Sequence, residues 1–176
     1  MALDLDSHFL SIETQAARKR IHFDSLIYAG GATSNNLAID GLSGPRVCHF
    51  RDMHDLSLIS QALKEGIKTA TVVGCGFYGV EAALALRACG LEVKIIEQKK
   101  RIMPSFSMSF AEAIVGKIKE QGIELRLNSS IVDARAIEGG GFSLTLHDGK
   151  TLASDLVVVC TGISPRTSLL ADAGAA

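Results

Sequence analysis

The sequence predicts an α/β protein built around a parallel sheet, and three observations carry this prediction. Two apolar strand patterns, KTATVV at 68–73 and EVKIIE at 92–97, flank a small-residue helix pattern at 77–89. This order is typical of a parallel βαβ unit. The glycine-rich turn GCGFYG joins the first strand to the helix. Farther along, IVDARAI and FSLTLH alternate apolar and polar residues around three glycines, which predicts an antiparallel β-hairpin layer beside the parallel sheet.

The composition is that of a folded domain whose partners are small molecules or protein. The chain has 176 residues, 47% of them hydrophobic, and a formal net charge of −1. It is long enough to bury a core, and it lacks the basic excess that favours nucleic acid or anionic lipid. No apolar run reaches the roughly 18 residues that span a bilayer, and residues 1–10 do not resemble a signal peptide. We therefore expect a cytoplasmic protein without nucleic-acid or membrane partners.

The cysteines and histidines show no metal-binding pattern. Cys48, Cys75, Cys89 and Cys160 are far apart and form no CxxC pair. A local zinc or dithiol motif is therefore not present, and the histidines also lack ligand spacing. We predict buried free thiols in a reducing compartment and no metal site.

The segments before the glycine turn predict short strands and one helix. HFLSIE and RKRIHF form a strand pair, and SLIYA at 25–29 predicts a buried strand that ends at Gly30. Residues 33–45 have no periodicity and predict a crossover, with a domain boundary near residue 46. Leu56, Ile59 and Leu63 follow helical spacing, which predicts a helix over 54–65.

The segments after the glycine turn complete the predicted domain. Ser109 followed by Glu112 predicts a capping box at the start of a helix that ends at Gly122. ELRL at 124–127 then predicts a third parallel strand, and DLVVVC at 155–160 predicts the last strong strand.

The glycine turn has the spacing of a nucleotide-binding cradle. Gly74, Gly76 and Gly79 follow GxGxxG: the first permits the tight turn, the second lets the backbone approach a pyrophosphate, and the third lets helix and strand pack closely. The glycines alone are also compatible with a tight turn that binds nothing. Because a complete βαβ unit surrounds them and Glu97 ends its second strand, the sequence predicts a Rossmann-like nucleotide-binding domain.

Glu97 favours NADH over NADPH. A carboxylate at the end of the second strand accepts hydrogen bonds from ribose hydroxyls and repels a 2′-phosphate. The basic run Lys99, Lys100 and Arg101 follows at once. It is either a solvated loop or a group of cations that reaches a 2′-phosphate.

With these motifs in place, the chain resembles a known family, the two-dinucleotide-binding-domain flavoproteins, or FAD/NAD(P)-linked pyridine nucleotide-disulfide oxidoreductases. The resemblance is to the branch with NADH oxidase, CoA-disulfide reductase, nitrite reductase and ferredoxin or rubredoxin reductase. It rests on segments in family order: SLIYAGGA, VCHFRDMHD, VVGCGFYGVEAALAL with its trailing glutamate, KKRIMP and DLVVVCTGISPRTSLL.

The resemblance implies a domain organisation. Residues 1–45 are expected to be a partial FAD-binding segment, 46–162 the NAD(H)-binding domain, and 163–176 the start of the return to the FAD domain. The family's N-terminal glycine motif, its redox cysteine and its later Gly-Asp flavin motif have no match in this sequence. We therefore expect a portion of a longer protein that is a homodimer when complete.

The resemblance also implies site residues. The residues expected to bind NADH are Gly74, Cys75, Gly76, Phe77, Tyr78, Gly79, Glu81, Glu97 and Gly162, and those expected to bind FAD are Ala29, Gly31 and Arg51. Phe77 matches an aromatic residue that gates the nicotinamide, although a packed core aromatic explains it equally well. Glu81 is a charge in an apolar helix, which is costly unless it is solvated or paired. Gly30 replaces the family's threonine, and Tyr78 an aliphatic residue.

The implied function is the NADH-binding portion of a FAD-dependent oxidoreductase, in which hydride passes from NADH to flavin and electrons pass to a further acceptor. We expect the chain alone to bind nucleotide without turnover, since it contains no acceptor-side catalytic residues. Two alternatives remain open: an NAD-sensing or structural binding module, and a self-contained Rossmann dehydrogenase. The second lacks an evident acid–base group downstream.

Overall fold

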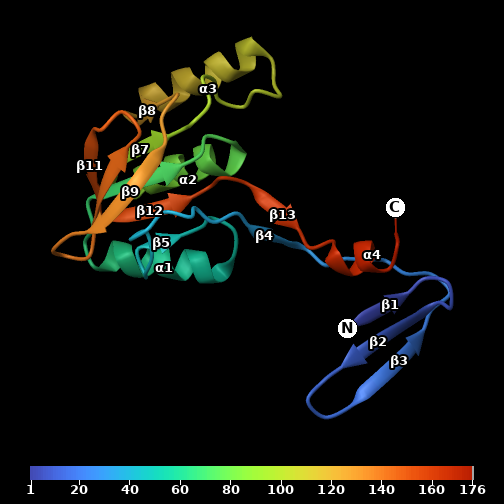
Figure 1. The fold of residues 1–176 in the computed structure, drawn as a ribbon. Helices are drawn as coiled ribbons and strands as arrows, with labels where there is room; N and C mark the ends of the chain where they lie inside the picture. Colours follow the sequence, from blue (N-terminus) through green and yellow to red (C-terminus); the bar gives the residue numbers. More distant parts are fainter. Residues whose placement is uncertain (176) are drawn as a thin grey trace. The chain divides into compact units, whose positions relative to one another are not determined.

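The computed structural model describes residues 1–175, and the chain divides into two compact units (Figure 1). Unit 1 comprises Met1–Thr33 together with the segment from Ile163 onward, and unit 2 comprises Ser34–Gly162. The sequence placed a boundary near residue 46. In the structure, Leu37, Ile39 and Leu42 pack against a core of unit 2, so the stretch 34–45 belongs to that unit.

Unit 2 is built on a five-stranded parallel sheet. Its strands are β5 (Val47–Cys48), β12 (Leu156–Val159), β6 (Thr69–Val73), β7 (Glu92–Ile96) and β8 (Glu124–Arg126), in that spatial order. All four pairings are parallel. The predicted parallel strands are confirmed. β5 was not predicted, since two residues are too short for an alternating pattern to emerge.

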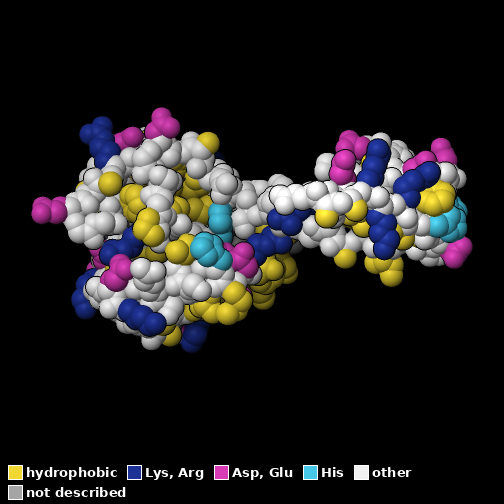
Figure 2. Space-filling view, turned by 90° about the horizontal axis from the view of Figure 1, so that it is seen from below, with side chains coloured by type: hydrophobic (Ala, Val, Ile, Leu, Met, Phe, Trp, Pro, Cys, Tyr) yellow, Lys and Arg dark blue, Asp and Glu magenta, His cyan; other side chains and the backbone are white. Residues whose placement is uncertain are grey.

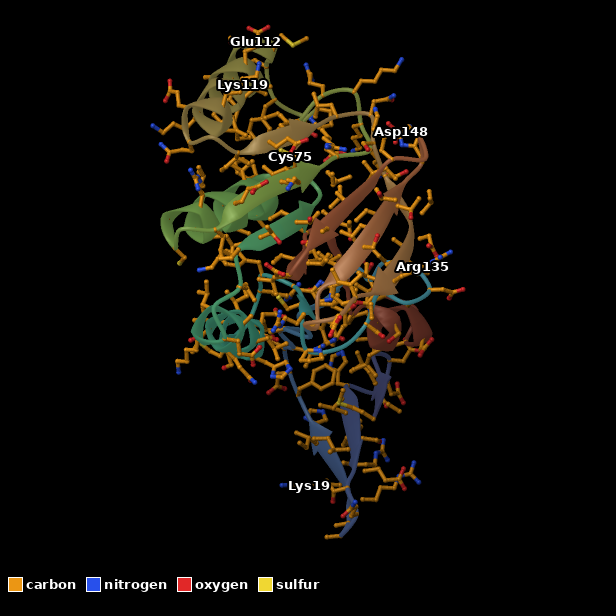
Figure 3. All side chains as sticks on the ribbon, turned by 90° about the vertical axis from the view of Figure 1, so that its left-hand side faces the viewer. Lys19, Cys75, Glu112, Lys119, Arg135 and Asp148 are labelled. Carbon is orange, nitrogen blue, oxygen red and sulfur yellow. The ribbon has the colours of Figure 1, made fainter. Side chains whose placement is uncertain are left out.

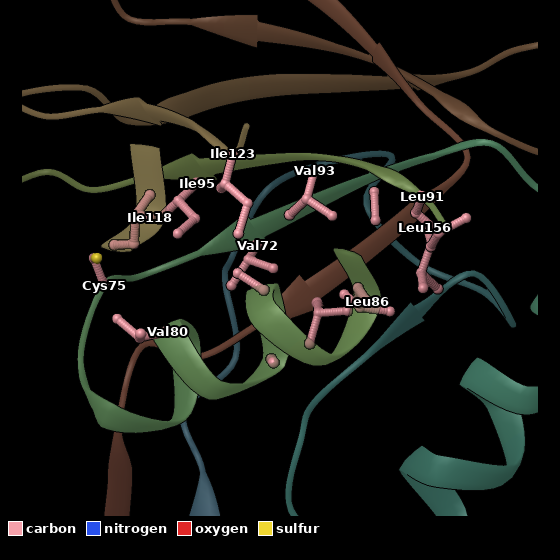
Figure 4. Close-up of a cluster of buried hydrophobic side chains, with 14 of the residues drawn as sticks. Val72, Cys75, Val80, Leu86, Leu91, Val93, Ile95, Ile118, Ile123 and Leu156 are labelled. Carbon is pink, nitrogen blue, oxygen red and sulfur yellow. The ribbon is translucent and has the colours of Figure 1, made fainter. Parts of the chain in front are cut away.

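Three helices cover one face of this sheet: α1 (Met53–Lys64), α2 (Phe77–Ala88) and α3 (Met108–Glu120). Apolar side chains from alternate strand positions point at these helices, because successive side chains of a strand face opposite sides. Figure 4 shows this core, in which Val72, Val93, Ile95 and Leu156 lie with Val80, Leu86 and Ile118 of the helices.

An antiparallel sheet covers the opposite face. It contains β9 (Ile131–Ala136), β10 (Phe142–Leu146) and β11 (Thr151–Ser154) in the order β11-β10-β9. The intervening positions of the parallel strands, Val73, Ile96, Val157 and Val159, pack against it. The predicted hairpin layer is therefore confirmed, with β11 as a third strand.

Helices α1 and α3 each begin at a residue whose side chain caps the first turn, but in α3 it is not the residue that the sequence predicted. Asp52 caps α1 in a capping box with Asp55. The predicted capping box of Ser109 and Glu112 is wrong. Ser107 is the N-cap of α3 and its side chain accepts a hydrogen bond from the Phe110 N–H, which places Ser109 inside the first turn. Both serines have the chemistry of a cap, and the earlier one starts the helix.

Unit 1 contains a three-stranded sheet, a two-stranded pairing and a short helix. β1 (Ala2–Asp4), β2 (Phe9–Glu13) and β3 (Arg18–His22) form an antiparallel sheet in the order β1-β2-β3. β13 (Ile163–Pro165) pairs with β4 (Ala32–Ser34), whose last residue is already counted in unit 2. The helix α4 (Ser168–Asp172) follows. The predicted strand pair at 8–23 is confirmed.

The predicted buried strand SLIYA is wrong. Residues 25–29 have no strand structure, and Ile27 is 93% exposed. An apolar run becomes a buried strand only where a neighbouring strand pairs with its backbone. None of the described strands pairs with this run. Tyr28 instead donates its hydroxyl hydrogen to the carbonyl of Arg166, and its ring occupies the space that a side chain at Gly30 would need.

Acidic and basic side chains are interspersed on the face of the molecule shown in Figure 2. Over residues 1–175, no helix has the length and apolar character needed to cross a membrane.

All four cysteines are free; Cys48 and Cys75 are buried and Cys160 is partly buried. The prediction of burial is wrong for Cys89, which is exposed because it forms the C-cap of α2.

Candidate functional site

The candidate site lies at the carboxyl end of β6. The chain leaves β6 through the glycine turn into α2 and returns as β7 on one side, whereas β12 pairs with the other side of β6. The strand order therefore changes direction at β6. In open α/β sheets, ligands bind in the crevice outside the strand ends at such a switch point. In Figure 3, Cys75 of the glycine turn lies by the parallel strands, whereas Lys119 and Glu112 lie on α3.

Gly74 and Gly79 are required by close packing. Gly74 has a φ of 101°, and a Cβ atom there would overlap the carbonyl oxygen of Cys160. Its N–H donates to the carbonyl of Ile96 at 2.8 Å. A Cβ atom at Gly79 would overlap the carbonyl oxygen of Gly74. These two glycines let the turn pass tightly between strand and helix.

Gly76 has a different environment. It is the N-cap of α2 and provides no side-chain cap for the first turn. A Cβ atom there would meet no atom within 4 Å. The N–H groups and positive dipole end of the helix thus face open space, which is the arrangement that accepts a phosphate group. A side chain at position 76 would extend into this open space.

Cys75 and Glu97 are joined by a hydrogen bond. The Cys75 N–H donates to Glu97 Oε2 at 2.7 Å, and the Lys99 N–H donates to Glu97 Oε1 at 2.8 Å. Glu97 is 9% exposed. Burial, and then the neighbouring charge of Glu97, raises the pKa of the Cys75 thiol to about 12. The thiol is therefore protonated at neutral pH and unreactive while it stays buried.

The basic run after β7 divides into two kinds of residue. The Arg101 guanidinium donates to the carbonyls of Pro104 and Phe106 and lies 3.9 Å from Met108 Sδ. It therefore holds the loop that leads into α3. Lys99 and Lys100 are exposed. Of the three cations, only these two extend into solvent.

Phe77 and Tyr78 lie on the surface at the start of α2, with exposed fractions of 57% and 60%. Phe77 packs edge-on against Phe106, with ring centroids 5.1 Å apart, and Phe106 lies equally close to Phe110. Phe77 is thus not a core aromatic, and that interpretation is wrong. Phe106 was not predicted as a neighbour of Phe77, since no periodic pattern covers the loop before α3.

Glu81 and Gly162 occupy exposed positions. Because Glu81 is solvated on the outer side of α2, its charge carries no burial cost, and the argument from that cost does not hold. Gly162 has a φ of 106°, and its carbonyl accepts a hydrogen bond from the Asn35 N–H at 3.0 Å. The segment before Gly162 adjoins the glycine turn through Cys160, a neighbour that the sequence alone did not reveal.

The residues assigned to FAD lie in different units. Ala29 and Gly31 are exposed in unit 1, and Gly31 has a φ of 70°. Arg51 is exposed in unit 2, where its N–H donates to Asp55 Oδ2 at 3.1 Å.

One groove lies beside the loop that follows β7. It has a volume of about 330 Å³. Apolar and basic side chains with one carboxylate line it: Lys100, Arg101, Ile102, Met108, Ala111, Glu112, Val115, Gly116, Lys119 and Leu127. Within residues 1–175, no group of three or more His, Cys, Asp or Glu side chains is placed to hold a metal ion.

Known proteins are similar to this chain in sequence and in fold. The chain is 29% identical to rhodocoxin reductase of Rhodococcus erythropolis over 155 residues, which is 88% of the chain and 36% of that protein. A ferredoxin reductase from Rhodopseudomonas palustris superposes with a TM-score of 0.86 at 28% identity, over 99% of the chain and 42% of that structure. A water-forming NADH oxidase from Lactobacillus brevis, solved with NADH, gives 0.82 at 26% identity, over 98% and 38%.

These matches share one property: the chain spans less than half the length of each relative. The family described as pyridine nucleotide-disulphide oxidoreductase matches residues 1–176. The fold, the glycine turn at the switch point and the family match agree. The chain belongs to the pyridine nucleotide-disulphide oxidoreductase family.

Proposed function

We propose that unit 2 binds NADH and that the complete protein is a FAD-dependent oxidoreductase, which passes hydride from NADH to flavin and electrons to a further acceptor. The observation that carries the proposal is the open space at Gly76, on the uncapped N-terminus of α2 and next to the carboxylate of Glu97. The relatives are named as reductases and oxidases, and one was solved with NADH bound.

The residues have distinct roles in this proposal. The backbone from Gly74 to Gly79, including Cys75 and Gly76, receives the pyrophosphate, because the first N–H groups of α2 point at an anion there. Glu97 accepts hydrogen bonds from the adenosine ribose, since two of its lone pairs remain after it has accepted two N–H groups.

The remaining side chains serve the nicotinamide end. Phe77, Tyr78, Glu81 and Gly162 border the nicotinamide ring, which supplies the hydride when the nucleotide is bound. Their part is to orient the ring and to exclude water from its reacting face.

NADH is preferred over NADPH. The negative charge of Glu97 repels a 2′-phosphate, and Arg101 is already engaged by backbone carbonyls. Only Lys99 and Lys100 are left to attract that phosphate, and exposed cations contribute little.

The flavin part of the proposal rests on Ala29, Gly31 and Arg51, whose exposed positions leave them accessible to FAD in the complete protein. The chain alone binds nucleotide without turnover. We also propose that the complete protein is cytoplasmic and a homodimer.

Calorimetric titration of the chain with NADH and with NADPH tests the proposal. The expected result is binding of both, with NADH at least tenfold tighter. Gly76→Val is expected to abolish binding while the circular dichroism spectrum stays that of the wild type, because the new side chain fills the ligand space. Equal or reversed affinities would refute the NADH preference.

Flavin spectroscopy of the complete protein tests the catalytic half. A yellow protein whose flavin absorbance is bleached by NADH supports it. A colourless protein that binds NADH would instead indicate a sensing or structural module, and NADH oxidation with a small substrate in the absence of flavin would indicate a self-contained dehydrogenase.

A further inference from the structure

Glu97 joins three separate segments of unit 2. Its carboxylate accepts hydrogen bonds from the N–H groups of Cys75 and Lys99, at 2.7 and 2.8 Å. Its own N–H donates to the carbonyl of Arg126 at 2.9 Å, and its carbonyl accepts from the Ser129 N–H at 2.9 Å. The glycine turn, the loop after β7 and the segment after β8 therefore meet at this one residue.

The carboxylate is held by backbone groups alone. Glu97 is 9% exposed, and within residues 1–175 no cationic side chain forms an ion pair with it. A buried carboxylate is costly unless hydrogen bonds compensate for its lost water. Hydrogen bonds from N–H groups to a charged acceptor are short and strong, so the bond to Cys75 restrains the turn firmly.

Cys75 lies between Gly74 and Gly76, and glycine has the greatest backbone freedom of any residue. The hydrogen bond to Glu97 therefore restrains a flexible part of the turn. The thiol of Cys75 is 1% exposed and packs in the core under the helices, in the cluster that contains Val80 and Ile95. The N–H bond to Glu97 and the buried thiol together fix the backbone at the point where the turn enters α2.

We propose that Glu97 is a positioning residue that holds the glycine turn in its nucleotide-accepting shape before any nucleotide binds. This inference rests on the proposed function for the identity of the ligand. Glu97 thus affects pyrophosphate binding through the position of the turn, which it holds by the N–H of Cys75, in addition to any contact with the ribose. Removing its charge weakens binding even of a nucleotide that lacks the hydroxyls of the adenosine ribose.

The variant Glu97→Gln tests this role with little change of shape. A glutamine amide accepts one N–H bond but presents an NH₂ group to the other donor, so the hold on either Cys75 or Lys99 is lost. Glu92→Gln is the matched control. Glu92 begins β7, the strand that Glu97 follows, and its exposed carboxylate forms an ion pair with Lys94.

The first measurement is alkylation of the nucleotide-free protein by N-ethylmaleimide, followed by peptide mass spectrometry. Loss of the Glu97 charge lowers the pKa of the Cys75 thiol and so speeds alkylation by itself, and exchange of the Cys75 amide hydrogen is therefore measured in parallel. Both alkylation and amide exchange at Cys75 are expected to be at least tenfold faster in Glu97→Gln than in the wild type or in Glu92→Gln, and unchanged amide exchange would overturn the inference. Cys48 is the internal standard, since it is buried at 3% exposure in β5. Its rate is expected to stay constant. An unchanged rate at Cys75, or an equal rise at Cys48, would overturn the inference.

The second measurement compares NADH with its analogue that lacks both the 2′- and the 3′-hydroxyl of the adenosine ribose, by calorimetry. A role through the turn predicts that Glu97→Gln also loses affinity for the analogue, while NADH loses at least as large a factor because its ribose contact is weakened as well. If the loss occurred with NADH but not with the analogue, Glu97 would act on the ribose alone and the inference would be wrong. If the wild type bound neither nucleotide, the proposed function would fail, while faster amide exchange at Cys75 in Glu97→Gln would still support the role of Glu97 in the turn.

Discussion

Gly79 approaches the carbonyl oxygen of Gly74 so closely that no side-chain carbon fits between them. This contact closes the turn between β6 and α2, and it is independent of any ligand. Gly76, only three residues before Gly79, has no such neighbour within 4 Å. Gly79 therefore permits close packing of the turn, whereas Gly76 leaves open space beside it. Mutations can test these two roles separately.

Gly79→Ala is expected to destabilise the chain by about 2–3 kcal/mol, because the methyl group must displace the backbone of the turn. The measurement is urea unfolding followed by circular dichroism. A midpoint equal to that of the wild type would contradict the packing role.

Gly116→Ala is expected to have the opposite effect. Gly116 lies inside α3, and a Cβ atom there would meet nothing within 4 Å. Alanine lowers the entropy of the unfolded chain and favours the helix, so a gain of about 0.5–1 kcal/mol is expected. The same urea titration measures it, and this variant is the control for Gly79→Ala. A loss of stability would show that α3 is more crowded than described.

Thr71→Val is expected to stabilise the protein by about 1 kcal/mol. Thr71 is 1% exposed in β6, and its hydroxyl oxygen has no hydrogen-bond partner among the described residues. Valine has nearly the same shape and carries no buried polar atom. Ser154→Ala is the matched contrast, because the buried Ser154 hydroxyl donates to the carbonyl of Leu156 at 2.8 Å. It is expected to lose about 1 kcal/mol. Thermal unfolding of both variants decides the comparison.

Asp155 is expected to stabilise unit 2 in a pH-dependent way. Burial raises the pKa of Asp155, but N–H bonds from Lys68 and Thr69, the Thr69 hydroxyl and the charge of Arg46 outweigh burial, so the pKa lies below the ordinary 3.8. The unfolded chain therefore takes up the proton first as the pH falls. The stabilisation by the Asp155 carboxylate is fully present above the pKa that this group has in the unfolded chain. It is lost as the pH falls from that pKa through the lower pKa of the folded protein.

The variant Asp155→Asn measures this contribution. Its stability deficit relative to the wild type is expected to be constant between pH 5 and 8 and to shrink as the pH falls below about 4. Urea titrations across this range supply the measurement. A deficit that grew toward acid pH would contradict the direction of the pKa shift.

The sequence predicted those parts of the fold whose signals are local. The strands around the glycine turn have apolar patterns and turn residues that specify their structure, and Glu97 directly follows β7, which ends one residue earlier than the sequence predicted. SLIYA at 25–29 has an equally strong apolar pattern but no strand beside it, and a strand requires a partner that sequence alone does not supply.

The candidate site was predicted less completely, because its contacts join residues that are far apart in the sequence. The bond from Cys75 to Glu97 joins residues in different loops, and the carbonyl of Cys160 that closes on Gly74 comes from a distant strand. Phe106, in the loop before α3, contacts Phe77 at the start of α2. Patterns along the chain identify residue types, whereas these neighbours depend on the register of the assembled sheet.

The place of β12 in the sheet has a consequence for how the chain folds. β12 is the last strand of unit 2 in sequence, yet it lies between β5 and β6, two of the earliest. β5 can enter the sheet only after residues 156–159 have been synthesised, so the sheet is completed from its middle. Such distant pairings slow folding. A ribosome-bound chain that ends before Leu156 would therefore expose the edge of β6 to other strands, and this is the stage at which the nascent protein is most prone to aggregate.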